Sequence, residues 1–153
     1  MWSENKKILE KVMTKTNLIL PVQNKQEKSI YETELLHIAI AKKDIRTIKY
    51  CLDVLKIGIN AESINGDTPL ITAVYSDEVE IVEFLCQYNG IDINTKGEYQ
   101  DTALGIADIL GLQEIKCFLL DHPNYDKNNS PEKYDKECSG KGSSNTRFNA
   151  IFG

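Results

Sequence analysis

A turn leads directly into a helix in the segment Asn60-Ala-Glu-Ser-Ile-Asn-Gly66-Asp-Thr-Pro-Leu70-Ile-Thr-Ala73. Asn65-Gly66 is the dipeptide best suited to the positive φ angles of a tight turn. Thr68 fits the N-cap of the helix that follows. Pro69 fits its first turn, where the missing N–H of proline costs no hydrogen bond. The segment therefore predicts a helix that begins at Thr68.

The same pattern recurs at a fixed spacing of 34 residues along the chain. The aligned columns hold leucines, alanines, aromatic residues and asparagines: Leu36, Leu70 and Leu104; Ala39, Ala73 and Ala107; Tyr50, Phe84 and Phe118; Asn60, Asn94 and Asn128. A period of this length is typical of solenoids built from supersecondary units that stack on their neighbours. The sequence therefore predicts three units of one repeat.

Each unit has the hydrophobic pattern of two short helices. In the second unit, Val79, Val82 and Leu85 form one apolar stripe, and glutamates lie on the opposite face. The predicted helix pairs are Thr33–Ala41 with Ile45–Leu55, Thr68–Tyr75 with Glu78–Tyr88, and Thr102–Ile109 with Leu112–Asp121. This arrangement predicts an all-α fold.

Residues 60–73, followed by Val79-Glu-Ile-Val-Glu-Phe-Leu85, resemble an ankyrin repeat nearly column for column. The resemblance covers about residues 30–128 and implies a solenoid of helix-turn-helix units at 30–62, 63–96 and 97–128. Only one unit keeps Thr-Pro-Leu, Gly105 replaces the family's histidine in the third unit, and the period is one residue longer than usual. For His37, which matches that histidine, the resemblance implies a structural hydrogen bond between turns.

The two ends of the chain differ from the repeats. In residues 1–29, Asn5–Thr16 is predicted as a capping helix followed by a linker, and docking of this helix on a partner is the alternative. Residues 129–153 form a predicted flexible, polar tail with an apolar end at Arg147–Gly153. That end folds back onto the repeats, serves as a linear motif for another protein, or is a remnant of expression.

The chain has 153 residues and a net charge of −5, and the charge is unevenly distributed. Residues 30–128 hold eight basic and seventeen acidic residues. An acidic centre argues against nucleic acid as the main partner, because phosphate binding needs a basic face. It favours a basic protein partner, and an ordinary solvated surface is the alternative.

The four cysteines are too few and too scattered for a secreted disulfide framework. Three of them, Cys51, Cys86 and Cys117, fall in apolar helical runs, where a free thiol behaves as a small hydrophobe. Charged residues interrupt the run from Ile8 to Pro21, so no signal peptide forms. No stretch approaches the roughly 20 apolar residues of a membrane span. We therefore expect a monomer in a cytosol, its own or that of a host cell.

Ankyrin proteins bind partners through turn tips and the exposed flank of each first helix, and the resemblance transfers this concave surface to this chain. The positions are Ile30, Tyr31, Thr33, Ala41 and Lys42; Ile64, Asn65, Asp67, Tyr75 and Ser76; Glu98, Tyr99, Asp101, Ile109 and Leu110. The three tyrosines are predicted anchors, since aromatic residues are enriched at interfaces. Ile109 and Leu110 would be exposed in a free solenoid, and we expect the apolar end of the tail to cover them.

Catalytic and metal-binding patterns are missing from the sequence. Neither His37 nor His122 has a Cys or His at metal-ligand spacing, and we expect the helix C-terminus to favour charged His122. Ser139–Ser144 lacks the order and context of a phosphate-binding loop. We therefore predict a protein-binding adaptor, inhibitor or effector without cofactor or metal. The alternatives are an enzyme or toxin with a site on the repeats or tail, and a fragment of a larger scaffold.

Overall fold

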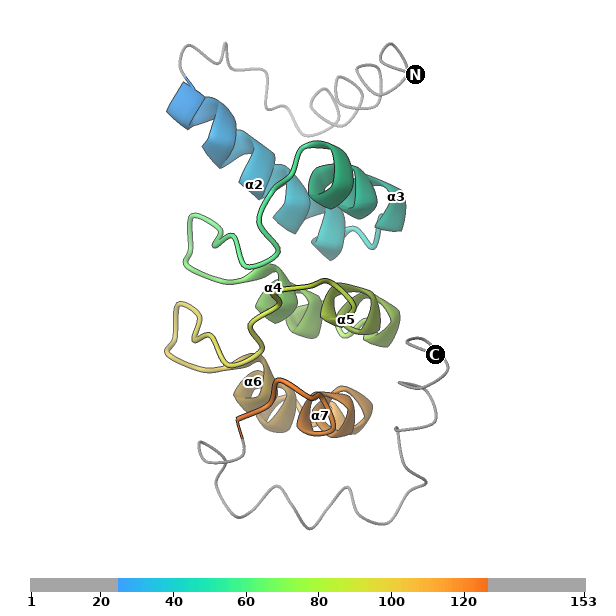
Figure 1. The fold of residues 1–153 in the computed structure, drawn as a ribbon. Coiled ribbons are helices and arrows are strands. Elements are labelled where there is room, and N and C mark those ends of the chain that lie inside the picture. The colour runs from blue at the N-terminus through green and yellow to red at the C-terminus, as the bar shows by residue number, and fades with distance from the viewer. Residues whose placement is uncertain (1–24, 127–153) are drawn as a thin grey trace.

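The computed structural model describes residues 25–126, and Figure 1 shows their helices stacked in pairs. Unit one consists of α2 (Lys25–Ala41) and α3 (Ile45–Lys49), which continues as the π-helix η1 (Tyr50–Val54). Unit two consists of α4 (Pro69–Tyr75) and α5 (Val79–Cys86), and unit three of α6 (Ala103–Ile109) and α7 (Gln113–Leu120). The predicted capping helix Asn5–Thr16 and the tail 129–153 lie outside the described residues.

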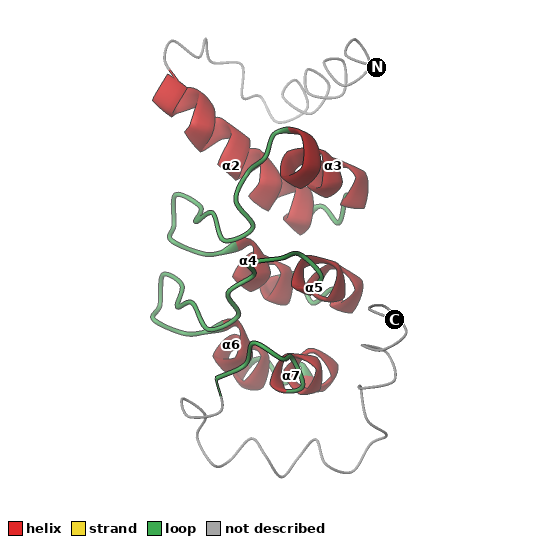
Figure 2. Ribbon diagram, viewed as in Figure 1, coloured by secondary structure: helices red, strands yellow, loops and turns green. Residues whose placement is uncertain are grey.

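The helices form two columns, an inner one of α2, α4 and α6 and an outer one of α3 with η1, α5 and α7. Figure 2 shows that helices and loops make up residues 25–126, with one isolated bridge between Lys96 and Thr102. Corresponding helices of successive units pack against each other: α2 on α4, α4 on α6, and α5 on α7. The predicted all-α repeat solenoid is confirmed.

Side-chain caps explain where three of the helices begin. The Thr68 hydroxyl accepts the Ile71 N–H at 3.3 Å, and the Thr102 hydroxyl accepts the Gly105 N–H at 3.2 Å. Asp44 accepts the N–H groups of Arg46 and Thr47 at the start of α3. These bonds satisfy N–H groups that have no partner within their own helix. The start predicted at Thr68 is thus confirmed.

The first helix begins earlier than predicted. It starts at Lys25 rather than at Thr33, inside the segment for which the sequence predicts a linker. No glycine or proline interrupts residues 25–32, and Lys28 pairs with Glu32 one turn later at 3.6 Å. The Thr33 hydroxyl donates back to the Ser29 carbonyl at 3.0 Å, as in a helix interior.

Left-handed backbone positions recur with the repeat, although glycine does not. They fall between paired helices, after the second helix and at the tip of the connecting loop: Lys43, Asp77 and Gly111; Lys56 and Gly90; Gly66 and Gln100. The positive φ expected at Gly66 is confirmed at 87°. The backbone path is therefore the same in each unit, and non-glycine residues adopt a conformation that disfavours them.

The third unit has charged residues at positions where the first two units have buried apolar residues. Ile40 and Val74 are fully buried in units one and two, as are Ile48 and Val82 on the second helices. The residues 34 positions after Val74 and Val82 are Asp108 and Lys116. Lys116 Nζ lies 2.7 Å from Asp108 Oδ1, and the lysine is only 3% exposed. An ion pair between α6 and α7 therefore replaces the apolar packing found at these positions in the other two units.

Candidate binding surface

Two hairpin-like loops, here called fingers, project from the same side of the stack (Figure 1). The first finger comprises residues 61–68 and the second comprises residues 95–102. The Ser63 N–H donates to the Asp67 carbonyl at 2.9 Å, and the Gly97 N–H donates to the Asp101 carbonyl at 3.0 Å. Each finger is thus closed by a main-chain hydrogen bond at equivalent positions and precedes an inner helix.

A carboxylate of the preceding repeat holds the tip of each finger. Glu34 Oε1 accepts the Ile64 N–H at 2.7 Å, and Asp67 Oδ1 accepts the Glu98 N–H at 3.1 Å. Ile64 and Glu98 are 34 residues apart, whereas their acceptors Glu34 and Asp67 are 33 apart, so equivalent tips are held from neighbouring positions of the preceding unit. Hydrogen bonds to an ionised acceptor are stronger than neutral ones. The tip of the first finger is therefore anchored to α2, and the tip of the second finger to the first finger.

The asparagine column links successive repeats behind the fingers. Asn60 Nδ2 donates to the Gly90 carbonyl at 2.7 Å, and its Oδ1 accepts the Asp92 N–H at 2.9 Å. Asn94 makes the corresponding contacts with the Asn124 carbonyl, at 2.9 Å, and with the Asp126 N–H, at 3.3 Å. An amide side chain is needed here because it donates and accepts at once.

His37 joins the first unit to the second, as the ankyrin resemblance implies. Its Nε2 lies 2.9 Å from the Ala61 carbonyl oxygen, and its Nδ1 lies 2.8 Å from Thr72 Oγ1. The side chain is buried. Ile71 takes the histidine position of the next unit and packs against the second finger near Gly97. The residues at this position in units one and two thus both contact the following unit.

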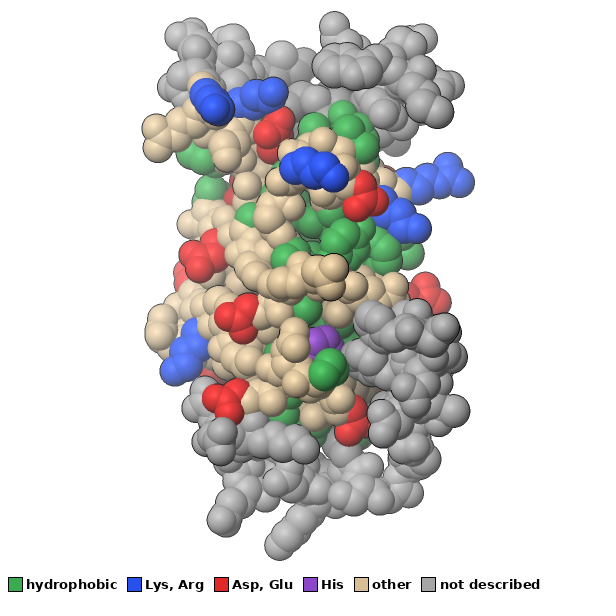
Figure 3. Space-filling model, in the orientation of Figure 1, with side chains coloured by type: hydrophobic (Ala, Val, Ile, Leu, Met, Phe, Trp, Pro, Cys, Tyr) green, Lys and Arg blue, Asp and Glu red, His purple; other side chains and the backbone are tan. Residues whose placement is uncertain are grey.

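Five of the predicted site residues come together between the fingers and α4. Burial and the nearby ionisable groups of Asp67, Tyr99, Asp101 and Glu98 raise the pKa of Tyr75. This aromatic–acidic cluster, defined as these four residues and Tyr75, joins the two fingers to the C-terminal end of α4. The tyrosines remain accessible, with Tyr75 46% and Tyr99 70% exposed. Acidic side chains lie along the finger side of the stack in Figure 3.

Four further predicted residues expose large apolar side chains, of which Ile30 lies on α2. Ile64 lies at the tip of the first finger, and Ile109 and Leu110 lie at the end of α6, where Ile109 is 71% exposed. Asn65 is also exposed, next to Ile64. Exposed apolar side chains that lie together are typical of contact sites. The tail that we expected to cover Ile109 and Leu110 lies outside the described residues.

The remaining predicted residues lie apart from the cluster. Ile30, Tyr31 and Thr33 are on α2, and Ala41 and Lys42 mark its C-terminal end. Tyr31 is not among the groups that act on Tyr75. The Ser76 hydroxyl donates to the Thr72 carbonyl at 3.0 Å and so caps α4. Tyr75 and Tyr99 thus lie at the end of α4 and on the second finger, whereas Tyr31 lies on α2, and a joint role of the three tyrosines in binding stays a prediction.

His122 differs from the expectation that it is charged. It is buried, and burial lowers its pKa. Its Nδ1 accepts the Asn124 N–H at 3.1 Å, which leaves Nε2 to donate to the Cys86 carbonyl at 3.4 Å. The cost of burying a charge exceeds the attraction of the helix C-terminus here. His122 is therefore a neutral structural residue.

The two free cysteines within residues 25–126 have no reactive environment. Cys51 and Cys86 are free and buried, and burial raises the pKa of each thiol to about 12. Such thiols are inert. Cys117 is disulfide-bonded, so the expectation of a free thiol is wrong at this position. Residues 25–126 contain no group of three or more His, Cys, Asp or Glu side chains that could hold a metal ion.

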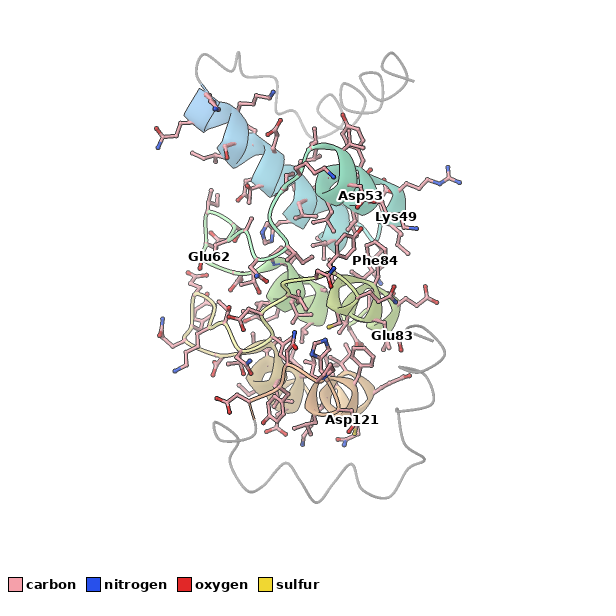
Figure 4. All side chains as sticks on the ribbon, viewed as in Figure 1. Lys49, Asp53, Glu62, Glu83, Phe84 and Asp121 are labelled. Carbon is pink, nitrogen blue, oxygen red and sulfur yellow. The ribbon has the colours of Figure 1, made fainter. Side chains whose placement is uncertain are left out.

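The outer side of the stack carries contacts that sequence reasoning missed. Lys49 Nζ lies 5.4 Å from the centre of the Phe84 ring, and the Tyr88 hydroxyl lies 3.2 Å from Asp53 Oδ1 (Figure 4). Phe84 and Tyr88 meet edge to face at 5.3 Å. Burial and Asp53 raise the pKa of Tyr88 to about 12. Both contacts join residues 35 positions apart, close to the repeat length, which is the signal that could have suggested them.

Stacked helix pairs with anchored fingers define a repeat solenoid with an accessible finger side. The family model of ankyrin repeats, described as three copies, matches residues 11–97 and 36–130. The chain therefore belongs to the ankyrin repeat family, whose repeats are generally protein–protein interaction modules. A search of curated proteins gave no match. Among the described residues, no helix has the length and apolar character needed to span a membrane.

Proposed function

We propose that this chain is an adaptor, inhibitor or effector that binds a basic protein partner on its finger side. The proposal rests on one observation: the exposed Tyr75 and Tyr99 lie at the end of α4 and on the second finger, next to fingers that carry Asp67, Glu98 and Asp101 and are joined by the bond from the Glu98 N–H to Asp67. Tyr75 and Tyr99 serve as the anchors, and Asp67, Glu98 and Asp101 meet basic side chains. The protein acts as a monomer in a cytosol, without cofactor, metal or catalytic step.

The aromatic side chains supply the binding energy in this proposal. Tyrosine buries a large apolar area with few rotatable bonds, so it loses little conformational entropy when a partner covers it. A cationic side chain is attracted to the face of an aromatic ring. Tyr75 and Tyr99 therefore suit both the apolar and the charged parts of a basic interface.

The charges of the fingers supply the preference for a basic partner. Within the two fingers, Lys96 is the one basic residue, while Glu62, Asp67, Glu98 and Asp101 are acidic. Glu62 is labelled on the first finger in Figure 4. Complementary potentials accelerate association and discriminate against partners of the same charge. An acidic protein surface would be repelled from this side.

The test is capture of partners with the double variant Tyr75→Ala, Tyr99→Ala. We expect proteins captured specifically by the unaltered chain to be basic, and the variant to hold them at least roughly tenfold more weakly. Val54→Ala is the control, because Val54 is an exposed apolar residue on the outer side. Circular dichroism checks that the helices are retained. Equal capture by all three proteins contradicts the proposal.

A further inference from the structure

One carboxylate at a position equivalent to that of Asp67 does not hold the tip of a finger within residues 25–126. Glu34 holds the tip of the first finger, and Asp67 holds the tip of the second. Asp101 lies 34 residues after Asp67, at the same place in the repeat. No N–H or hydroxyl of residues 25–126 donates to its carboxylate, whereas its main-chain carbonyl closes the second finger. The Asp101 carboxylate is thus placed to receive an N–H that the described stack does not supply.

Gly105 lies beside this carboxylate and has no side chain, unlike the equivalent residues of the first two units. The corresponding residues of the first two units, His37 and Ile71, reach the finger of the following unit. A Cβ atom on Gly105 would lie 3.6 Å from Thr102 Oγ1 and 3.8 Å from Asp101 Oδ1, both ordinary contact distances. A carbon atom at this position therefore fits without a clash, in contact with Thr102 and the Asp101 carboxylate.

Exposed apolar side chains border the same end of the inner column. Ile109 and Leu110 are 71% and 49% exposed, at positions where unit two has Tyr75 and Ser76. We infer that Asp101, Gly105, Ile109 and Leu110 form a docking edge for an extended, basic segment of the protein partner. A main-chain N–H of that segment binds the Asp101 carboxylate, and one of its side chains packs against Gly105.

The sequence after the repeats is a poor match to this edge. Closure of a finger requires a main-chain N–H at the positions of Ser63 and Gly97, and the residue 34 positions after Gly97 is Pro131, which has none. Residues 129–135 also carry two acidic side chains and one lysine, which does not complement the carboxylates of Glu98 and Asp101. A basic segment of another protein fits the charge of the edge better.

This inference rests on the proposed function, because it assigns part of the same partner to the end of the finger side. The test starts from a random twelve-residue peptide library displayed on phage and selected against the full chain. Selected peptides are synthesised, their dissociation constants are measured, and their effect on amide NMR signals is mapped. We expect extended peptides rich in Arg or Lys that shift the signals of Asp101, Gly105 and Ile109.

Two variants and a control give the decisive comparison. Asp101→Ala should raise the dissociation constant by roughly tenfold or more, since it removes a charged acceptor. Gly105→Ile should also weaken binding by placing a side chain at this contact, while it strengthens the helix. Glu80→Ala removes the same charge from the exposed side of α5 and should have no effect. Circular dichroism confirms that each variant is folded.

Several outcomes would overturn the inference. These are the selection of no peptide or of acidic peptides, and dissociation constants that do not change with Asp101→Ala. In the unliganded chain, movement of the signals of residues 128–135 on Asp101→Ala would show that the chain itself occupies the edge. If the Tyr75→Ala, Tyr99→Ala variant releases the peptides and Asp101→Ala does not, the docking edge is wrong and the proposed function stands. Retention of the peptides by both would contradict both.

Discussion

The imidazole of His37 lies 2.8 Å from the Thr72 hydroxyl, so a side chain of α2 hydrogen-bonds directly to a side chain of α4. The other ring nitrogen reaches the Ala61 carbonyl in the first finger. One buried residue thus connects an inner helix, the next inner helix and a finger. In a solenoid, stability depends on such contacts between neighbouring units.

Replacing His37 by alanine should therefore destabilise the fold. His37→Ala removes two hydrogen bonds and leaves the Ala61 carbonyl and the Thr72 hydroxyl without this partner. We expect a loss of about 2 to 3 kcal/mol in the free energy of unfolding, measured by urea denaturation. Gln87→Ala, at an exposed site, is the control. A loss below about 0.5 kcal/mol would mean that the interaction is not structural.

The second finger should not tolerate a side chain at Gly97. A Cβ atom there would lie 2.4 Å from Asp67 Oδ1 and 2.9 Å from Ile71 Cδ1, so Asp67 would have to leave the Glu98 N–H. We expect Gly97→Ala to cost about 1 to 3 kcal/mol in thermal or urea unfolding. In Gly58→Ala, the nearest contact is 3.9 Å, and this variant should be nearly neutral. Similar effects of the two changes would refute the close approach.

Glycine should stabilise the repeat where another residue adopts the left-handed conformation. Asp77 has a φ of 51° at the position where unit three has Gly111, and Gln100 has a φ of 62° where the first finger has Gly66. Relief of strain exceeds the entropy that glycine loses on folding. We expect Asp77→Gly and Gln100→Gly each to raise the stability by about 0.5 kcal/mol. Gly66→Ala should have the opposite sign, and a decrease in both glycine variants would contradict this account.

His122 should make stability depend on pH. Because burial lowers its pKa in the folded chain, the unfolded chain binds more protons between that value and 6.5. This contribution is present above pH 6.5 and is lost as the pH falls toward the folded-state pKa. Urea unfolding at about pH 5 should therefore show a lower free energy than at about pH 7.5. The difference should shrink in His122→Gln, and an unchanged difference would exclude His122 as its source.

Local signals in the sequence predicted most of the helical framework. Thr68 and Pro69 start α4 as expected, because capping and proline geometry depend on residues within one turn. The predictions were wrong where the outcome depends on contacts with residues that are distant in the sequence. Lys25 rather than Thr33 starts α2, and burial of His122 outweighs the effect of its helix end. Of the predicted site, Tyr75 and Tyr99 share a cluster that Tyr31 does not join.

The sequence alone determined the period, the all-α class and the family, because these depend on spacing and on side-chain type along the chain. Only the stacked structure decided which carboxylates hold finger tips, why Gly97 must be glycine, and that Asp101 and Gly105 are left without a following finger among residues 25–126. These contacts join residues about 30 positions apart. Their geometry follows from how one unit is rotated and shifted on the next, which no local pattern specifies.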